Sequence, residues 1–594
     1  MRSFRRLPVT AHVTGDLLIG GHSETAPFLD SSTAREVSRS GRGKPIIPAS
    51  ALKGALREAT VRLVRGRGKQ ACLPFDEPCG PNPCLVCRLF GRPGPDRPGE
   101  PNSEGSATGT ESGTPSAEMP GSLWFEDLIA DSWFESSRIR HGVGVDRKTG
   151  HASDGLLFVR EVAGSDSPYL GAVCGWLTDD EVTLLRQACL LLGAIGNSRS
   201  RGLGAISITL GDAEAVSPDG VTLPEGEAVL VITAESDLHF GDVPDGGNFK
   251  GTTRFIPGSA IQGALAAALV RGGVNPQSVD FKHLLATLSV SDAWPTSDGD
   301  LWCPAPRTLF ACPVHDRIVV DRTAGLALAP SLLAHGGRPA EPARCTRKGC
   351  TETLRRASGV RHPSRPTSPL IVDTRIVTRL ALDPTTRSAA EGMLFSREQI
   401  EAHSRFSATV SGLDATVRGL LAQLRHPIRL GGMRGRGLGR VRLNWTTFDS
   451  RNVDQRVSDQ GERISAVTTP VRELLGLPEG RWLELVARTP MQLPGEVTPA
   501  SSGRWLGETL FPGRQVRAWS FARAGVRSGW DGAGTTAGPR PFTPVLRAGA
   551  VWLLLIDGEA PLNTAALVRA ETAGVGEGTK LGLGRLCAWS CALG

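Results

Sequence analysis

Three short phrases occur twice in this chain of 594 residues, in the same order, and they constrain the fold more than any other feature. The phrase PASALKGAL of residues 48–56 returns as PGSAIQGAL at 257–265. Residues 146–158 and 383–395 share six of 13 positions, and the loop RSRGLG at Arg199 returns later as RGRGLG. The copies lie 209, 237 and 235 residues apart, so each repeated unit is a whole domain rather than a solenoid turn. A duplicated domain predicts one task carried out twice along a repetitive ligand.

The repeats also predict the domain organisation. Strand-like segments alternating with a few helical ones favour the α+β class, and Ser50 is the expected N-cap of the helix after Pro48. Residues 91–122 consist almost entirely of Gly, Pro, Ser, Thr and Glu, which predicts a disordered insertion. The expected parts are a first domain (1–212), a linker (213–226), a second domain (227–450) and a C-terminal half-domain (451–594). In the last, GTKLGLGR at 578–585 is a looser third copy of the Arg-Gly loop.

Composition narrows the location and the class of partner. No apolar run approaches the roughly 20 residues of a membrane span, and the start MRSFRRLPVTAHV lacks a signal-peptide core. We therefore expect a cytoplasmic protein. The net charge of +7 is a mild excess, but arginines beside glycines suit phosphate groups. A general enrichment of Arg and Gly along the chain is the alternative.

Twelve cysteines in a chain expected to be cytosolic favour metal binding or free thiols over disulfides. Two clusters have the spacing of structural Zn²⁺ sites. The first is Cys72, Cys79, Cys84 and Cys87, within a zinc-binding insertion at 72–87; the second is Cys312, His315, Cys345 and Cys350, within 303–350. His335 and Cys303 are alternative ligands of the second cluster, and reduced free cysteines are the alternative for both.

The Arg-Gly loops are the strongest candidates for nucleic-acid contact. Each lies between an apolar helix and a strand, where backbone N–H groups beside arginines can bind a phosphate chain. A tight turn required by packing is the alternative reading. Because all three loops are basic and end a domain, RNA binding is the favoured interpretation.

The combination of IPASALKG with a later RxRGLG loop resembles the RAMP superfamily (repeat-associated mysterious proteins) of CRISPR effector complexes. The first unit looks like the backbone, seven-family-like subunit of type III complexes, through LIGG at 18–21, IPASALKG at 47–54, CLVCRLFG at 84–91 and VDRKTG at 145–150. The second unit with the tail, through FIPGSAIQG at 255–263, RLALD at 379–383 and AEGMLF at 390–395, is similar to the larger, five-family-like subunit of type III-D systems. A second backbone-type unit is the alternative for it.

The resemblance implies tandem ferredoxin-like, RRM-type domains, each with a β-hairpin thumb that presses between guide and target RNA. It also implies crRNA, target RNA and other type III subunits as partners: a large polymerase/cyclase-type subunit, further RAMP subunits and a small subunit. Gln262 replaces the lysine of the family motif in the second unit. By position, the implied RNA contacts are Ser50, Lys53, Arg57, Arg147, Lys148, Arg199, Arg201, Ser259, Arg434, Arg436 and Lys580.

The same resemblance implies metal-dependent cleavage of target RNA by an aspartate in the loop after Gly21. Asp30 is the positional match, and with Mg²⁺ or a similar divalent ion it would promote in-line attack of a 2′-hydroxyl. Glu24 and His22 are lesser candidates. The second unit, with Asp242 and Asp245 in the corresponding loop, is expected only to bind.

Two further readings stay open at this point. The chain would be a purely architectural crRNA-binding subunit without nuclease activity, or a metal-stabilised scaffold with no nucleic-acid role. The second of these leaves the ordered repeats unexplained.

Overall fold

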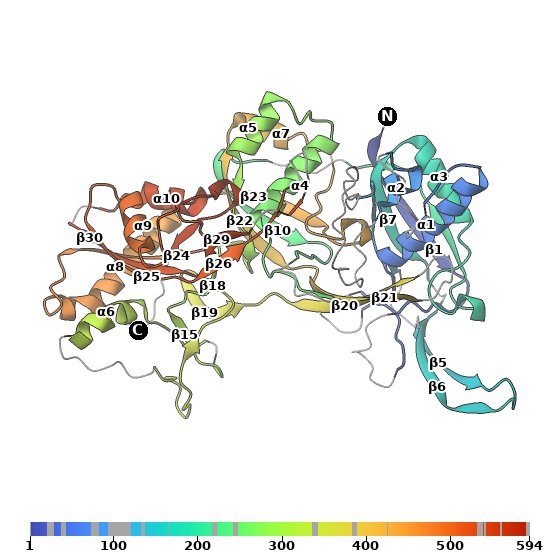
Figure 1. The fold of residues 1–594 in the computed structure, drawn as a ribbon, viewed down its shortest axis with the longest axis horizontal. Helices are drawn as coiled ribbons and strands as arrows, with labels where there is room; N and C mark the ends of the chain where they lie inside the picture. The colour runs from blue at the N-terminus through green and yellow to red at the C-terminus, as the bar shows by residue number, and fades with distance from the viewer. Residues whose placement is uncertain are drawn as a thin grey trace, which may run out of the picture.

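The chain folds into three modules, seen in a computed structural model (Figure 1). In Figure 1 the first module is blue to cyan, the second runs from green through yellow to light orange, and the third is orange to red. The structure describes residues 2–20, 29–36, 43–72, 82–92, 120–131, 137–164, 167–216, 222–241, 248–315, 317–334, 343–382, 389–424, 426–531, 538–539, 542–558 and 561–589. Most of the insertion expected to be disordered, residues 93–119, lies outside these ranges.

The first module is a sheet with strand order β4-β7-β1-β8, extended at its edge by β2. The hairpin β5–β6 is inserted before β7. The elements are β1 (Ser3–Val13), β2 (Ile46–Ile47), α1 (Ala49–Gly66), α2 (Leu85–Phe90), β3 (Leu123–Phe125), β4 (Leu128–Ala130), β5 (Ser137–Val145), β6 (Ala152–Ala163), β7 (Tyr169–Leu177), α3 (Asp179–Leu190), the 3₁₀ turn η2 (Arg199–Arg201) and β8 (Ile206–Leu210). In the linker, β9 (Glu214–Ala215) pairs with β1.

The second module repeats this plan with the order β12-β22-β10-β23. Its elements are β10 (Gly226–Ala234), β11 (Phe249–Lys250), α4 (Gly258–Arg271), α5 (Val279–Thr287), β12 (Ser289–Val290), β13 (Trp294–Pro295), the hairpin β20 (Thr374–Leu382) and β21 (Ala389–Ile400), β22 (Arg405–Leu413), α7 (Ala415–Leu421), η3 (Arg434–Arg436) and β23 (Val441–Thr447). An insertion before β20 holds β14 (Cys303–Pro304), β15 (Leu309–Ala311), β16 (Val319–Asp321), α6 (Thr323–Ala334), β17 (Arg355–Arg356), β18 (Val360–His362) and β19 (Arg365–Leu370).

The C-terminal segment is a third complete module rather than the expected half-domain. Its sheet has the order β25-β30-β24-β31, the same arrangement as the other two. The elements are α8 (Arg451–Arg472), β24 (Gly480–Ala487), α9 (Ser502–Leu510), β25 (Val516–Phe521), β26 (Ala524–Arg527), β27 (Trp530–Asp531), β28 (Gly538–Pro539), β29 (Thr543–Leu546), β30 (Val551–Asp557), α10 (Thr564–Thr572), η4 (Thr579–Leu581) and β31 (Leu586–Ala588). In each module a helix follows the first strand, a hairpin precedes the third, and a second helix and a glycine loop precede the last.

Each module has its own apolar core beneath its sheet. In α1, Leu52, Leu56 and Ala59 are buried at helical spacing, as the sequence predicts. The helix begins at Ala49, so Ser50 is not its N-cap. The carboxylate of Asp127 accepts the backbone N–H of Ala49 at 2.6 Å instead.

The last glycine of each Arg-Gly loop is required by backbone packing. Gly204, Gly439 and Gly584 have φ of +74°, +88° and +72°. A Cβ at these positions would lie 1.9, 2.3 and 1.9 Å from a carbonyl oxygen of the preceding segment, closer than any side chain tolerates. The packing alternative therefore accounts for these glycines, and the arginines need a separate explanation.

The modules contact each other head to tail through a repeated arrangement. Asp292 accepts the N–H of Gly258 at the start of α4 and two bonds of 2.7 Å from Arg527 in the hairpin of the third module. At the first junction Asp127 caps α1, and Arg379 in the hairpin of the second module interacts electrostatically with it. At each junction, a carboxylate beside a helix N-terminus thus interacts with an arginine of the following module.

Replacing Arg527 with Ala should destabilise the second junction, because the side chain of Asp292 is fully buried and would lose its counter-charge. Loss of one partner of a buried pair costs about 3 kcal/mol or more, which lowers the melting temperature of the affected transition by roughly 6–12 °C. Differential scanning calorimetry measures this. Arg451→Ala, which breaks the exposed pair with Asp449, is the control and should melt like the wild type; equal melting of both variants would contradict the role given to Arg527.

Candidate RNA-binding surface and metal centres

The three Arg-Gly loops occupy two kinds of environment. In the first loop Arg199 is half-buried and Arg201 is exposed, and Ser198 at its start accepts a hydrogen bond from Arg160 of the same module. The second loop packs on the first module, where a Cβ at Gly435 would lie 3.2 Å from Nζ of Lys53. In the third loop, the carbonyl of Thr579 accepts the hydroxyl of Ser289 from the second module at 2.7 Å. Two of the loops therefore lie at module junctions, which the sequence did not indicate.

The arginines of the second loop border this junction. Arg434 is half-buried, and burial lowers the pKa of its guanidinium. Arg436 is exposed, and it interacts electrostatically with Arg379. Lys580 of the third loop is exposed. Thus Arg436 and Lys580 keep accessible charges although their loops dock on a neighbour.

The residues of α1 and α4 that were expected to contact RNA also differ in their exposure. Ser50 and Ser259 are half-buried in the first turns of α1 and α4, and Gln262 donates its side-chain amide to the carbonyl of Leu288. Arg57 is buried, and its guanidinium donates to the carbonyl of Gly91 at 2.7 Å. The prediction that Arg57 faces a guide RNA is therefore wrong.

Arg57 instead lies beside the first cysteine cluster. Burial lowers the pKa of this guanidinium, while nearby Cys87, Cys84 and Cys72 raise it. A cation here compensates the negative charge of thiolates, so the residue belongs to the cysteine cluster rather than to the RNA surface.

The hairpin β5–β6 projects away from the first module at the lower right of Figure 1. Arg147 and Lys148 lie exposed in its turn, which Asp146 closes by accepting the backbone N–H groups of Lys148 and Thr149. These two hydrogen bonds lower the pKa of Asp146. Apolar side chains along the hairpin are exposed, Leu157 at 68%, which is unusual for a surface with no partner.

Asp30 lies at the base of this hairpin. Its carboxylate accepts the backbone N–H of Val159 in β6 at 2.6 Å, and its own N–H donates to the carbonyl of Val159. The residue is exposed. Arg160, next in the strand, donates to the hydroxyl of Ser198 at the start of the first Arg-Gly loop. Asp30 thus lies near both the hairpin and the loop.

The other candidates named in the corresponding loops of the two units are a histidine, a glutamate and two aspartates. His22, Glu24, Asp242 and Asp245 fall outside the described residues. Among the residues that are described, Asp30 joins no group of three or more potential metal ligands.

The second cysteine cluster gathers the four residues named from its spacing. The ligand atoms of Cys312, His315, Cys345 and Cys350 all lie within 4.8 Å of one another. Cys312 Sγ is 3.9 Å from Cys350 Sγ, and His315 Nδ1 is 3.5 Å from Cys312 Sγ. A tetrahedral Zn²⁺ with bonds of about 2.3 Å to sulfur and 2.0 Å to nitrogen separates such atoms by about 3.8 and 3.5 Å. The donor set therefore fits such an ion.

Local backbone geometry supports this donor set. Burial opposes ionisation of Cys312, but the backbone N–H groups of Val314 and His315 outweigh it and lower the pKa of the thiol. The alternative ligand Cys303 is buried elsewhere, against Cys587. His335 lies outside the described residues.

The first cysteine cluster is seen in part. The sulfur atoms of Cys72, Cys84 and Cys87 lie within 4.8 Å of one another, and Cys79 lies outside the described residues. Cys84 precedes α2, and its sulfur accepts the backbone N–H of Cys87 at 3.5 Å. Burial raises the pKa of Cys84, but hydrogen bonds from the other two cysteines lower it to about 7. Three soft ligands at this distance can hold a metal ion.

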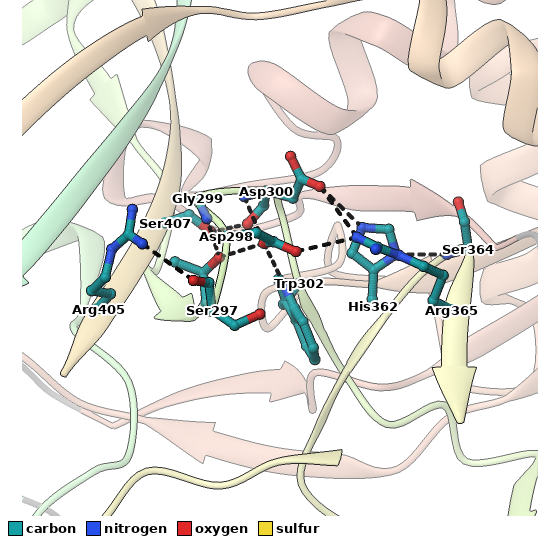
Figure 2. Close-up of polar contacts among 11 residues, drawn as sticks. Ser297, Asp298, Gly299, Asp300, Trp302, His362, Ser364, Arg365, Arg405 and Ser407 are labelled. Carbon is teal, nitrogen blue, oxygen red and sulfur yellow. Dashed lines mark hydrogen bonds and ion pairs between the residues drawn. The ribbon is translucent and has the colours of Figure 1, made fainter. Parts of the chain in front are cut away.

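A further polar cluster joins the insertion to the second module (Figure 2). One carboxylate oxygen of Asp298 accepts the indole N–H of Trp302 and the backbone N–H of Asp300, and the other accepts Arg365. Burial opposes ionisation, but the hydrogen bonds from Trp302, Asp300 and Thr296 lower the pKa of Asp298. His362 faces the carboxylate of Asp300 at 3.5 Å. Protein donors contact both carboxylates, so this cluster anchors β18 and β19 to the second module.

Sequence reasoning missed Asp127 and Asp292. They lie 78 and 34 residues after the helix starts that they bind, because different insertions intervene. In both modules the aspartate lies between two short strands that pair with the same neighbour: β3 and β4 with β7, and β12 and β13 with β22.

A family model of the RAMP superfamily matches residues 10–207 and 231–442, the first two modules. A search of curated proteins found no match. No helix in the described part of the chain is both long and apolar enough to cross a bilayer.

Metal analysis tests the two cysteine clusters. Wild-type protein should carry about two equivalents of zinc and Cys345→Ser about one, because a closed site loses its ion when a thiolate is removed. Inductively coupled plasma mass spectrometry gives the content. Cys189→Ser, a buried thiol outside both clusters, should keep about two; an unchanged content in Cys345→Ser would exclude the second centre.

Proposed function

The chain belongs to the RAMP superfamily, and we propose that it is a type III, III-D-like CRISPR effector subunit that binds crRNA and target RNA and cleaves the target. Family membership by itself implies a CRISPR-associated RNA-binding subunit. The proposal adds the RNA species, the complex type and the reaction.

The observation that carries the proposal is the head-to-tail series of modules. Each has an Arg- or Lys-bearing glycine loop and a hairpin, so the same binding elements recur along the molecule. The strand-helix-strand-strand-helix-strand sequence of each module is consistent with a ferredoxin-like fold. A repeating polyanion is the natural ligand of such a series, because most of its affinity comes from backbone phosphates.

The hairpins are suited to contact bases rather than phosphates. Ile139, Val145 and Leu157 of the first hairpin are 55%, 57% and 68% exposed, as are Ile376 and Leu394 of the second at 50% and 54%. Apolar side chains inserted into a duplex unstack adjacent bases. We propose that the hairpins separate guide from target in this way, while base pairing supplies the sequence specificity.

Cleavage is assigned to Asp30. A divalent ion bound there would supply charge stabilisation at the scissile phosphate. The chain contributes the orientation: two backbone bonds to Val159 hold Asp30 against the hairpin, and the hairpin would present a displaced nucleotide beside it. Structural Zn²⁺ is proposed for both cysteine clusters. The purely architectural alternative keeps the RNA binding and lacks this step.

Asp30→Asn should lower the rate of target cleavage at least about 100-fold and leave target affinity unchanged, since only the carboxylate charge is lost. Cleavage of labelled target by the assembled ribonucleoprotein gives the rate, and a gel-shift titration gives the affinity. The control is Asp154→Asn, an exposed carboxylate on the same hairpin. Undiminished cleavage by Asp30→Asn moves the chemistry elsewhere and favours the architectural alternative.

A separate experiment tests whether the first Arg-Gly loop, with Arg199 and Arg201, binds RNA. Arg199→Gln with Arg201→Gln should reduce the slope of log affinity against log salt by about 1.4, because two single-strand phosphate contacts are lost. Melting should not change, since neither guanidinium forms a described ion pair. Fluorescence anisotropy at several salt concentrations measures the slope, and wild-type behaviour of the double variant would remove this loop from the binding surface.

A further inference from the structure

Four arginines from two modules gather where the insertion of the second module meets the third. Arg307 follows β14 and Arg356 lies in β17, both in the insertion. Arg523 and Arg547 flank the hairpin strands β26 and β29 of the third module. The sequence gave no indication of this cluster, because up to 240 residues separate its members.

Backbone contacts fix the place where these residues meet. The N–H of Arg307 donates to the carbonyl of Gly549 at 3.0 Å, and the N–H of Arg547 donates to the carbonyl of Arg523 at 2.9 Å. Gly549 has φ of +82°, and a Cβ there would lie 2.8 Å from the carbonyl oxygen of Ala305. The insertion and the third module therefore approach each other as closely as their backbones allow.

The side chain of Arg547 is also positioned by a glycine. A Cβ at Gly525 would lie 2.8 Å from both Cγ and Nε of Arg547, so the arginine occupies the space above that strand position. The approach of Arg547 to Arg523 and Arg307 is thus part of the packing of the hairpin base.

The charges in this cluster are not compensated within the described part of the chain. Burial lowers the pKa of Arg307, and the positive charges of Arg356, Arg523 and Arg547 lower it further. Across the described ranges, none of the four guanidiniums forms an ion pair with a carboxylate. Arg356, Arg523 and Arg547 are exposed and Arg307 is half-buried, so a ligand can reach them.

Other arginines of the same junction behave differently. Arg527 binds Asp292, Arg488 donates to the carbonyls of Trp302 and Ser407, and Arg585 donates to Ser289. The junction therefore supplies partners to its structural arginines. Four like charges held together without a partner match an external anion, because guanidinium groups bind phosphate oxygens with paired hydrogen bonds.

We propose that Arg307, Arg356, Arg523 and Arg547 form a phosphate site that binds adjacent backbone phosphates of an RNA strand crossing from the insertion to the third module. The assignment of the strand rests on the proposed RNA-binding function. The site itself rests on the backbone contacts of Arg307, Arg523 and Arg547, on the pairing of Arg356 in β17 with Phe310 in β15, three residues after Arg307, and on the electrostatic interaction of Arg307 with the other three arginines.

The test compares Arg523→Gln/Arg547→Gln with the wild-type full chain, using a fluorescein-labelled single-stranded RNA. The double variant should bind roughly tenfold more weakly and show a salt slope smaller by about 1.4, as for two lost phosphate contacts. Arg569→Gln, an exposed arginine on α10 outside the cluster, is the matched control and should bind as the wild type does. Equal affinity and slope in the double variant would overturn the site while leaving the proposed function intact.

A second arm does not depend on RNA binding. Inorganic pyrophosphate should raise the melting temperature of the wild type and of Arg569→Gln, but not that of the double variant, because it binds only the folded site. If the wild type binds no RNA, the proposed function fails while this arm still decides the phosphate site. Equal pyrophosphate effects in all three proteins would overturn it. Displacement of the RNA by polyglutamate of matched charge would overturn the phosphate assignment in favour of an acidic protein partner.

Discussion

The structure depends on a carboxylate placed beside the start of a helix and shared with the next module. Asp127 and Asp292 accept the first helical N–H groups of α1 and α4, where the helix dipole favours a negative charge. Arg379 and Arg527 approach the same carboxylates from the hairpin of the following module. One interaction therefore fixes the start of a helix and the position of its neighbour.

This arrangement gives the molecule a direction and two different ends. Each following module brings a hairpin and a glycine loop to the module before it, so the second and third loops lie at junctions, whereas Arg199 and Arg201 belong to the loop of the first module. At the other end, Ser520 takes the place of the aspartate and binds the N–H of Gly503 near the start of α9. The contact between an aspartate and an arginine of the following module thus occurs at both junctions of this chain, and at the corresponding position of the third module a serine stands in place of the aspartate.

The packing of the modules on one another also divides the basic residues into three classes that differ in burial and in partners. Arg57, Arg488 and Arg585 are buried and donate to carbonyls or hydroxyls, where each compensates a polar group that packing has removed from water. Arg201, Arg436 and Lys580 keep exposed charges. Arg307, Arg356, Arg523 and Arg547 form a third class, in which like charges are held together at a junction. In this protein, composition could not distinguish these roles, because the cationic side chains are of the same types and only their tertiary surroundings differ.

The sequence by itself determined the repetition, the α+β class, the stripe of Leu52, Leu56 and Ala59, and the grouping of Cys312, His315, Cys345 and Cys350. These features depend on short-range spacing or on direct comparison of segments, and both can be read along a chain. Only the tertiary structure decided that the tail is a complete module, that Asp127 rather than Ser50 caps α1, and that Arg57 is buried. It also brought Arg307 and Arg547 together. Each of these results depends on contacts between distant segments, whose separation varies with the insertions between them, so no fixed spacing in the sequence records them.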